Sequence, residues 1–132
     1  IFACGNVLHV HDLVDFVSEE AAIAGENAAA YVMGKKVETE CDYIDIKTEA
    51  GIRYTVPQRI NIEAMRDKVK VRFRVGDVYK DKFISVYAGE ERIIHKKKKV
   101  LAPGEMEEIL LDKDMLMNIS NISTIKVCLE EE

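Results

Sequence analysis

Apolar residues recur with two different periods along the chain, and the change falls near residue 40. From Leu13 to Met33 they recur every three or four positions, which is typical of a helix with one apolar face. Beyond residue 41, apolar and polar residues alternate every second position, which is typical of half-buried strands. The pattern predicts two domains, residues 1–40 and residues 41–132, joined by an acidic linker from Val37 to Asp42.

The ends of the predicted helix carry recognisable capping residues. Asp12 is expected to cap the N-terminus, and Asp15 stands where a capping box would place an acidic residue. Gly34 is expected to end the helix in the left-handed conformation. The apolar face combines large residues near the start with a strip of small ones, namely Leu13, Phe16, Val17, Ala21, Ala24, Gly25 and Ala28. Because small residues allow another backbone to come close, we predict that copies of the chain associate through this helix.

The remainder of the chain is predicted to be an antiparallel β-sandwich. Residues 43–47 and 52–56 alternate on either side of a turn and predict a hairpin, and Ile60 to Ile62 predicts a short edge strand. Lys68 to Val75 is apolar at every odd position and basic at every even one, which predicts one core face and one solvated face. Further strands are expected at 82–87, 91–95, 106–111 and 124–130. The fold class is therefore α+β, with an immunoglobulin-like all-antiparallel double sheet favoured over a small closed barrel.

Candidate chemistry lies at the start of the chain. The apolar run Ile1–Val7 (IFACGNV) stops at Gly5 and Asn6, and the helix follows. A strand, a glycine turn and a helix start would bring backbone N–H groups and a positive dipole end toward a bound cofactor. The same order also occurs as a plain connection in any α/β protein.

The run IFACGNV resembles the second flavin-contact motif of the pyridine nucleotide-disulfide oxidoreductase family. In that motif an acidic residue hydrogen-bonds the flavin ribityl chain, and here Asn6 stands at its position. The resemblance implies that FAD is the cofactor and that this chain belongs to an NAD(P)H-linked oxidoreductase similar to the thioredoxin reductases. It also implies a set of flavin contacts in this sequence, namely Gly5, Asn6, Val7, Asp12, Leu13 and Val14.

The rest of that family's machinery is missing from the chain. It contains no GxGxxG motif and no CxxC redox pair. We therefore expect the chain to be the C-terminal fragment of a larger flavoprotein, with the N-terminal nucleotide-binding domains as its missing partner. Since a glycine-rich loop anchors the pyrophosphate in this family, we expect the fragment alone to be inactive and not to retain FAD.

Three side chains near the motif are weaker candidates for a catalytic role. His9 and His11 lie in the connection before the helix, and imidazole changes charge near neutral pH. Cys4 would lie near the flavin, but it has no second cysteine two or three residues away. Alternate histidines in a loop, with Asp12 as the only adjacent carboxylate, are a weak metal signal, so we predict no metal site.

Composition excludes several other classes. The net charge is −5, and no apolar run reaches the length of a membrane span. Three widely separated cysteines argue for a reducing compartment, so we predict a cytoplasmic protein. The run Lys96 to Lys99 lacks interleaved aromatic residues, so it predicts a solvated edge strand and no binding of nucleic acid or membrane.

Two functional classes follow from these observations. In the first, residues 1–40 complete a flavin site and the sandwich is an accessory domain of an oxidoreductase. In the second, the whole chain is a non-catalytic interaction or oligomerisation module, and the likeness to the flavin motif is accidental. A GxGxxG motif upstream in a longer polypeptide would favour the first class.

Overall fold

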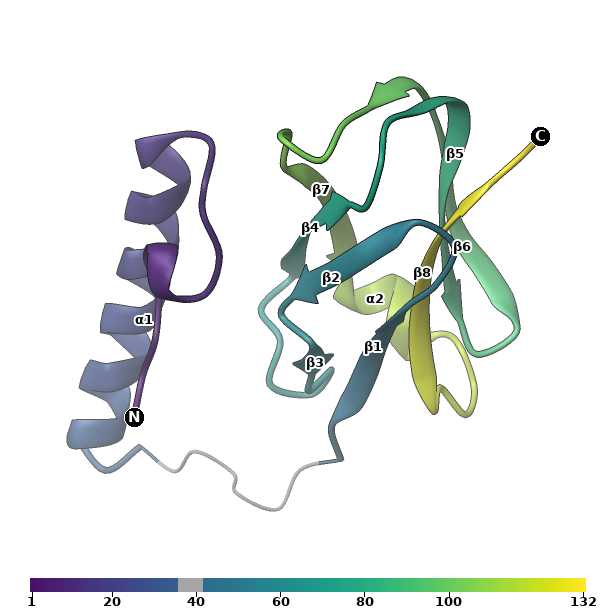
Figure 1. Cartoon of the computed structure of the whole chain (residues 1–132). Coiled ribbons are helices and arrows are strands. Elements are labelled where there is room, and N and C mark those ends of the chain that lie inside the picture. The colour runs from purple at the N-terminus through teal and green to yellow at the C-terminus, as the bar shows by residue number, and fades with distance from the viewer. Residues whose placement is uncertain (36–41) are drawn as a thin grey trace. The chain divides into compact units, whose positions relative to one another are not determined.

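The structure, a computed structural model, describes residues 1–35 and 42–132 (Figure 1). The chain divides into two compact units, Ile1–Cys41 and Asp42–Glu132. Unit 1 contains one long helix, and unit 2 contains strands in two sheets. The chain is thus a mixed α+β protein in which strands predominate, which confirms the predicted class at this level. The predicted linker, apart from Asp42, lies outside the described residues.

Unit 1 consists of a one-turn 3-10 helix, η1 (Gly5–Val7), and helix α1 (Val14–Val32). The predicted helix is confirmed to within one residue at each end. Its C-terminus also ends as predicted, because Gly34 has φ +71°. The N–H groups of Gly34 and Lys35 donate to the carbonyls of Tyr31 and Ala30, which satisfies carbonyls at the helix end.

Two predictions for unit 1 were wrong. Residues 1–4 form no strand, and Gly5–Val7 forms a 3-10 turn. A strand needs a neighbouring strand to accept its hydrogen bonds, and the described part of unit 1 contains none. The cap was also misplaced, because the N-cap is Leu13, whose side chain makes no capping hydrogen bond. Asp12 lies one residue too early for that role.

The chain before α1 folds back along the helix (Figure 1). Phe2 contacts Tyr31 edge-on, with ring centroids 6.0 Å apart, so the first residues reach the C-terminal part of the helix. Even so, no residue of α1 is buried. Val14, Ile23 and Val32 are 74%, 46% and 83% exposed, so large apolar side chains of the helix lie in water.

Unit 2 is built from eight strands and one short helix. Their bounds are β1 (Ile44–Thr48), β2 (Ile52–Val56), β3 (Arg59–Ile60), β4 (Lys68–Val75), β5 (Tyr79–Ala88), β6 (Glu91–Leu101), β7 (Glu107–Asp112), α2 (Lys113–Met117) and β8 (Thr124–Glu130). A five-stranded sheet has the order β3-β1-β8-β5-β6, and a three-stranded sheet has the order β2-β4-β7. Every strand predicted beyond residue 41 is present, although Ile62 lies outside β3.

The predicted hairpin at 43–56 and the all-antiparallel pairing were wrong. β1 and β2 belong to different sheets, because the turn at Glu49–Gly51 carries the chain from one sheet to the other. β1 instead pairs in parallel with β8, from Asp45 opposite Thr124 to Thr48 opposite Val127. Local alternation predicts a strand but not its neighbour, and here the pairing joins the two ends of unit 2.

Side chains from both sheets share one core. The three-stranded sheet contributes Val71, Phe73 and Val75 from β4, and the five-stranded sheet contributes Ile84 and Val127 among others. Val71, Phe73 and Ile84 have no exposed surface. The alternation predicted for β4 holds on this face.

The other face of β4 is less solvated than predicted. Arg72 is only 5% exposed, and its Nε lies 3.2 Å from Glu108 Oε2 on β7. Arg74 donates to the carbonyls of Pro103 and Gly104. A long side chain can lay its aliphatic stem along the sheet while its charged end finds a partner, so a basic residue in the pattern need not point into water.

Candidate functional site

The segment that carries the predicted chemistry is organised around Gly5. Its φ is +69°, and a Cβ at this position would meet Val17 Cγ1 at 3.2 Å, so glycine suits both the turn and its contact with α1. The Gly5 N–H donates to Glu20 Oε2 on α1. The Asn6 side chain closes the loop, because its Oδ1 accepts from the backbone N–H of His11 at 3.3 Å.

The predicted flavin contacts lie on this loop and on the first turn of α1. Gly5 is buried, whereas Asn6, Val7, Asp12, Leu13 and Val14 are exposed. The N-cap residue Leu13 makes no side-chain capping hydrogen bond, and the first turn of a helix has backbone N–H groups without partners inside the helix. These residues thus lie together at the N-terminal end of α1, where the helix dipole favours a negatively charged group.

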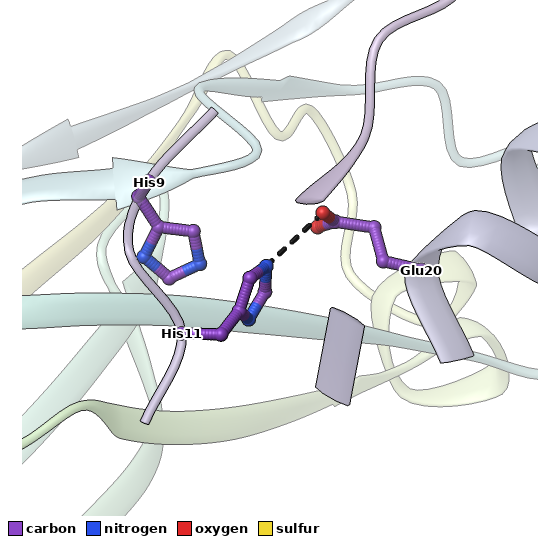
Figure 2. A group of neighbouring side chains, drawn as sticks. All are labelled: His9, His11 and Glu20. Atoms are coloured by element: carbon purple, nitrogen blue, oxygen red, sulfur yellow. Dashed lines mark hydrogen bonds and ion pairs between the residues drawn. The ribbon is translucent and has the colours of Figure 1, made fainter. Parts of the chain in front are cut away.

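The buried centre of unit 1 is formed by polar side chains. His9 and His11 are 7% and 8% exposed, and their ring centroids lie 4.4 Å apart in an edge-on arrangement. His11 Nε2 lies 3.1 Å from Glu20 Oε2, and the Glu20 side chain is only 16% exposed (Figure 2). The side chains of His9, His11 and Glu20 form what we call the histidine–carboxylate cluster. One ligand atom from each residue lies within 4.8 Å of the others.

The two histidines were candidates from the sequence, but Glu20 was not predicted. Asp12 is the carboxylate next to the histidines in sequence, and it is exposed. No local pattern joins Glu20 to this loop, because the contact depends on the Gly5 turn folding the loop onto the first half of α1. Glu20 stands in that part of α1.

Cys4, the third weak catalytic candidate, is a free thiol of intermediate exposure. Cys128, in unit 2, is a buried free thiol, and Cys41 lies outside the described residues. Burial raises the pKa of the Cys128 thiol, which disfavours its reactive thiolate form.

A second polar cluster lies in unit 2 and contains a serine, a histidine and a glutamate. Ser85 Oγ is 2.8 Å from His95 Nδ1 and donates to Glu130 Oε2 at 2.6 Å. Since the one hydroxyl proton goes to the carboxylate, His95 Nδ1–H must donate to Ser85 and cannot act as its base. Ser85 also has no exposed surface. These residues therefore tie β5, β6 and β8 together and do not resemble a nucleophilic triad.

The same carboxylate determines the ionisation of its neighbours. Hydrogen bonds from Ser85 and Tyr87 hold the pKa of the Glu130 carboxyl below its ordinary value. The hydrogen bond to Glu130 in turn raises the pKa of Tyr87. Both shifts favour an ionised carboxylate and a neutral phenol at neutral pH.

A cleft of about 520 Å³ lies in unit 2, along β1 and β2. Asp45 and Arg59 on its lining form an ion pair at 3.9 Å. Lys47, Glu49 and Arg53 also line it, so both signs of charge are present. Mixed charges of this kind select no single class of ligand.

The lysine run lies on β6, an edge strand of the five-stranded sheet, as predicted. Lys98 forms an ion pair with Glu107 at 2.6 Å, and Lys97 lies over the ring of Phe83. Two of the lysines are thus engaged within unit 2.

No family model, curated protein or solved structure matches the chain. Within the described residues, no helix combines the length and apolar character needed to cross a membrane.

Proposed function

We propose that this chain is the C-terminal part of an FAD-dependent NAD(P)H oxidoreductase similar to the pyridine nucleotide-disulfide family. The observation that carries the proposal is the motif IFACGNV followed by a helix. In this reading unit 1 supplies flavin contacts, and the missing N-terminal nucleotide-binding domains of a larger cytoplasmic protein supply the rest of the site.

The local geometry supports this role in two ways. The positive φ of Gly5 lets the backbone turn sharply where a ligand would approach. The start of α1, where Leu13 supplies no side-chain cap, offers N–H groups and a positive dipole end, which suit the electron-rich pyrimidine edge of a flavin. Asn6 can give and accept hydrogen bonds with ribityl hydroxyls, without the charge of the family's acidic residue.

FAD would supply hydride acceptance and electron transfer, and these residues would bind and orient it. Gly5, Asn6 and Val7 would lie along the ribityl chain, and Asp12, Leu13 and Val14 would lie at the ring edge. Unit 2 would be an accessory domain. Its two sheets around one core support an immunoglobulin-like sandwich, with the parallel β1–β8 pair as a departure from the antiparallel arrangement.

Flavin content tests the proposal. The chain itself, incubated with FAD and then gel-filtered, is expected to show no flavin absorbance, because it has no pyrophosphate-binding loop. The longer polypeptide is expected to retain FAD and to be reduced by NADH or NADPH. Its Asn6→Ala variant should retain less FAD, whereas Asn27→Ala, at an exposed position of α1, should not. A longer polypeptide that neither contains a GxGxxG motif nor retains flavin would refute the proposal.

A second candidate function is a non-catalytic interaction or oligomerisation module. The observation that favours it is the exposed apolar surface of α1, where Val14, Ile23 and Val32 face water. Large apolar side chains that a helix leaves in water favour packing against a partner. Self-association without any flavin in the longer polypeptide would favour this alternative.

A further inference from the structure

The histidine–carboxylate cluster buries groups that ordinarily require compensation. Imidazole and carboxylate lose hydration when they are buried, and this costs free energy unless hydrogen bonds or a bound ion replace the water. His11 makes one compensating contact, from Nε2 to Glu20 Oε2 at 3.1 Å, whereas its Nδ1 has no exposed surface and no hydrogen-bond partner among the residues that the structure describes. In the same segment large apolar side chains are exposed, while the polar side chains of His9 and His11 are buried.

We propose that His9, His11 and Glu20 bind a divalent first-row transition-metal ion, of which Zn²⁺ is the simplest probe. The three side chains come from two elements that the fold brings together, the loop before α1 and the second turn of α1. This inference goes beyond the proposed flavin function and does not depend on it.

The distances suit a metal ion. Bonds of about 2.0–2.2 Å to nitrogen and oxygen place neighbouring ligand atoms roughly 3.0–3.5 Å apart. His11 Nε2 and Glu20 Oε2 are 3.1 Å apart, so an ion could replace the proton between them with little movement. The widest separation within the cluster, up to 4.8 Å, needs to close by roughly 1 Å, which small side-chain rotations provide.

The ligand types determine which ions fit. Two imidazoles and one carboxylate suit Zn²⁺, Fe²⁺ or Co²⁺ better than Ca²⁺ or Mg²⁺, which prefer sets of oxygen ligands. Three protein ligands leave at least one coordination position open, as in catalytic metal sites. The Gly5 N–H holds Glu20 Oε2 in place, an outer contact of the kind that orients metal-binding carboxylates.

Titration of the metal-free chain with Zn²⁺, followed by calorimetry, tests the site. The wild type is expected to bind one equivalent, and Co²⁺ in its place should give d–d absorption bands of nitrogen and oxygen coordination. His9→Ala and His11→Ala should each weaken binding roughly tenfold or more, as loss of a ligand requires. His95→Ala removes the chain's third histidine, in unit 2, and should leave the affinity unchanged.

Two further variants separate metal binding from folding and from thiol binding. Glu20→Gln keeps an oxygen that can accept from the Gly5 N–H but removes the charge, so it should keep the helical circular dichroism and weaken binding. Replacing Cys4, Cys41 and Cys128 together with serine should not change the affinity. Binding that survives His9→Ala and His11→Ala, or that is lost with the cysteines, would overturn the proposal, as would no Zn²⁺ binding by the wild type.

Discussion

The two units distribute burial in opposite ways. In unit 2, seventeen apolar residues form one core. Among the described residues of unit 1, only Gly5, His9 and His11 are buried, while the large apolar residues of α1 remain in water. Unit 2 thus holds what an independent domain needs, whereas unit 1 has a polar centre suited to a ligand and an apolar surface suited to a partner.

The core of unit 2 gives the largest expected effect. Phe73→Ala removes a fully buried ring from β4 and should lower the free energy of unfolding by about 3–5 kcal/mol. Since small domains are stable by only about 5–15 kcal/mol, much of unit 2 would then unfold at moderate denaturant concentration. Urea unfolding followed by tyrosine fluorescence measures this. Phe2→Ala, at a half-exposed phenylalanine of unit 1, is the matched control and should leave that transition unchanged.

The apolar surface of α1 gives the next largest effect. We expect the chain to self-associate through this helix, and Phe16→Glu to weaken the association by about tenfold or more, because burying one large apolar side chain contributes roughly 1.5–3 kcal/mol. Sedimentation velocity over a concentration series measures it.

Two variants control that experiment. Ile23→Glu, at a 46% exposed position farther along α1, should act in the same direction as Phe16→Glu. Ser18→Glu adds the same charge at an exposed position off the apolar strip and should have little effect. If the wild type is a monomer at every concentration, the association through α1 does not occur.

A glycine pair tests how unit 1 holds its loop on the helix. Gly5 and Gly34 have nearly the same positive φ, but only Gly5 contacts Val17, while a Cβ at Gly34 would enter open space. Gly34→Ala should cost about 1–2 kcal/mol for its left-handed conformation. Gly5→Ala should have the same conformational cost and a further cost, because its Cβ would press on Val17 Cγ1.

Thermal unfolding of the helical circular dichroism signal measures the difference between the two variants. In a Gly5→Ala, Val17→Ala double variant the new Cβ no longer meets the Val17 side chain. Adding Gly5→Ala to Val17→Ala should therefore cost only what its left-handed conformation costs. Equal effects of the two glycine substitutions would show that the loop does not pack against α1.

The smallest effect concerns acid pH and unit 2. Because the pKa of Glu130 is lower in the folded state, its contribution to stability is fully present above the unfolded pKa of about 4.3. That contribution is lost as the pH falls through the folded pKa. The difference in melting temperature between the wild type and Glu130→Gln should therefore shrink from pH 6 to pH 3. A difference that is constant across this range would show that the carboxylate charge has no part in it.

The sequence by itself determined the elements whose causes are local. The helix appeared within one residue of its predicted bounds, because its apolar period and Gly34 act over a few neighbouring residues. The strands after residue 41 appeared because alternation is a local property. The same reasoning placed β6, with its lysines, at a sheet edge.

Tertiary structure decided which elements meet, and with it the candidate site. The parallel pairing of β1 with β8 joins segments about eighty residues apart, and no local pattern encodes that neighbour. The apolar pattern of Ile1 to Cys4 predicts a strand, but the described part of unit 1 contains no strand with which they could pair. His9 and His11 were visible as candidates, but Glu20 joined them only because the Gly5 turn folds the loop onto α1. Contacts between distant residues depend on how elements pack, so the cluster could be seen only in the folded chain.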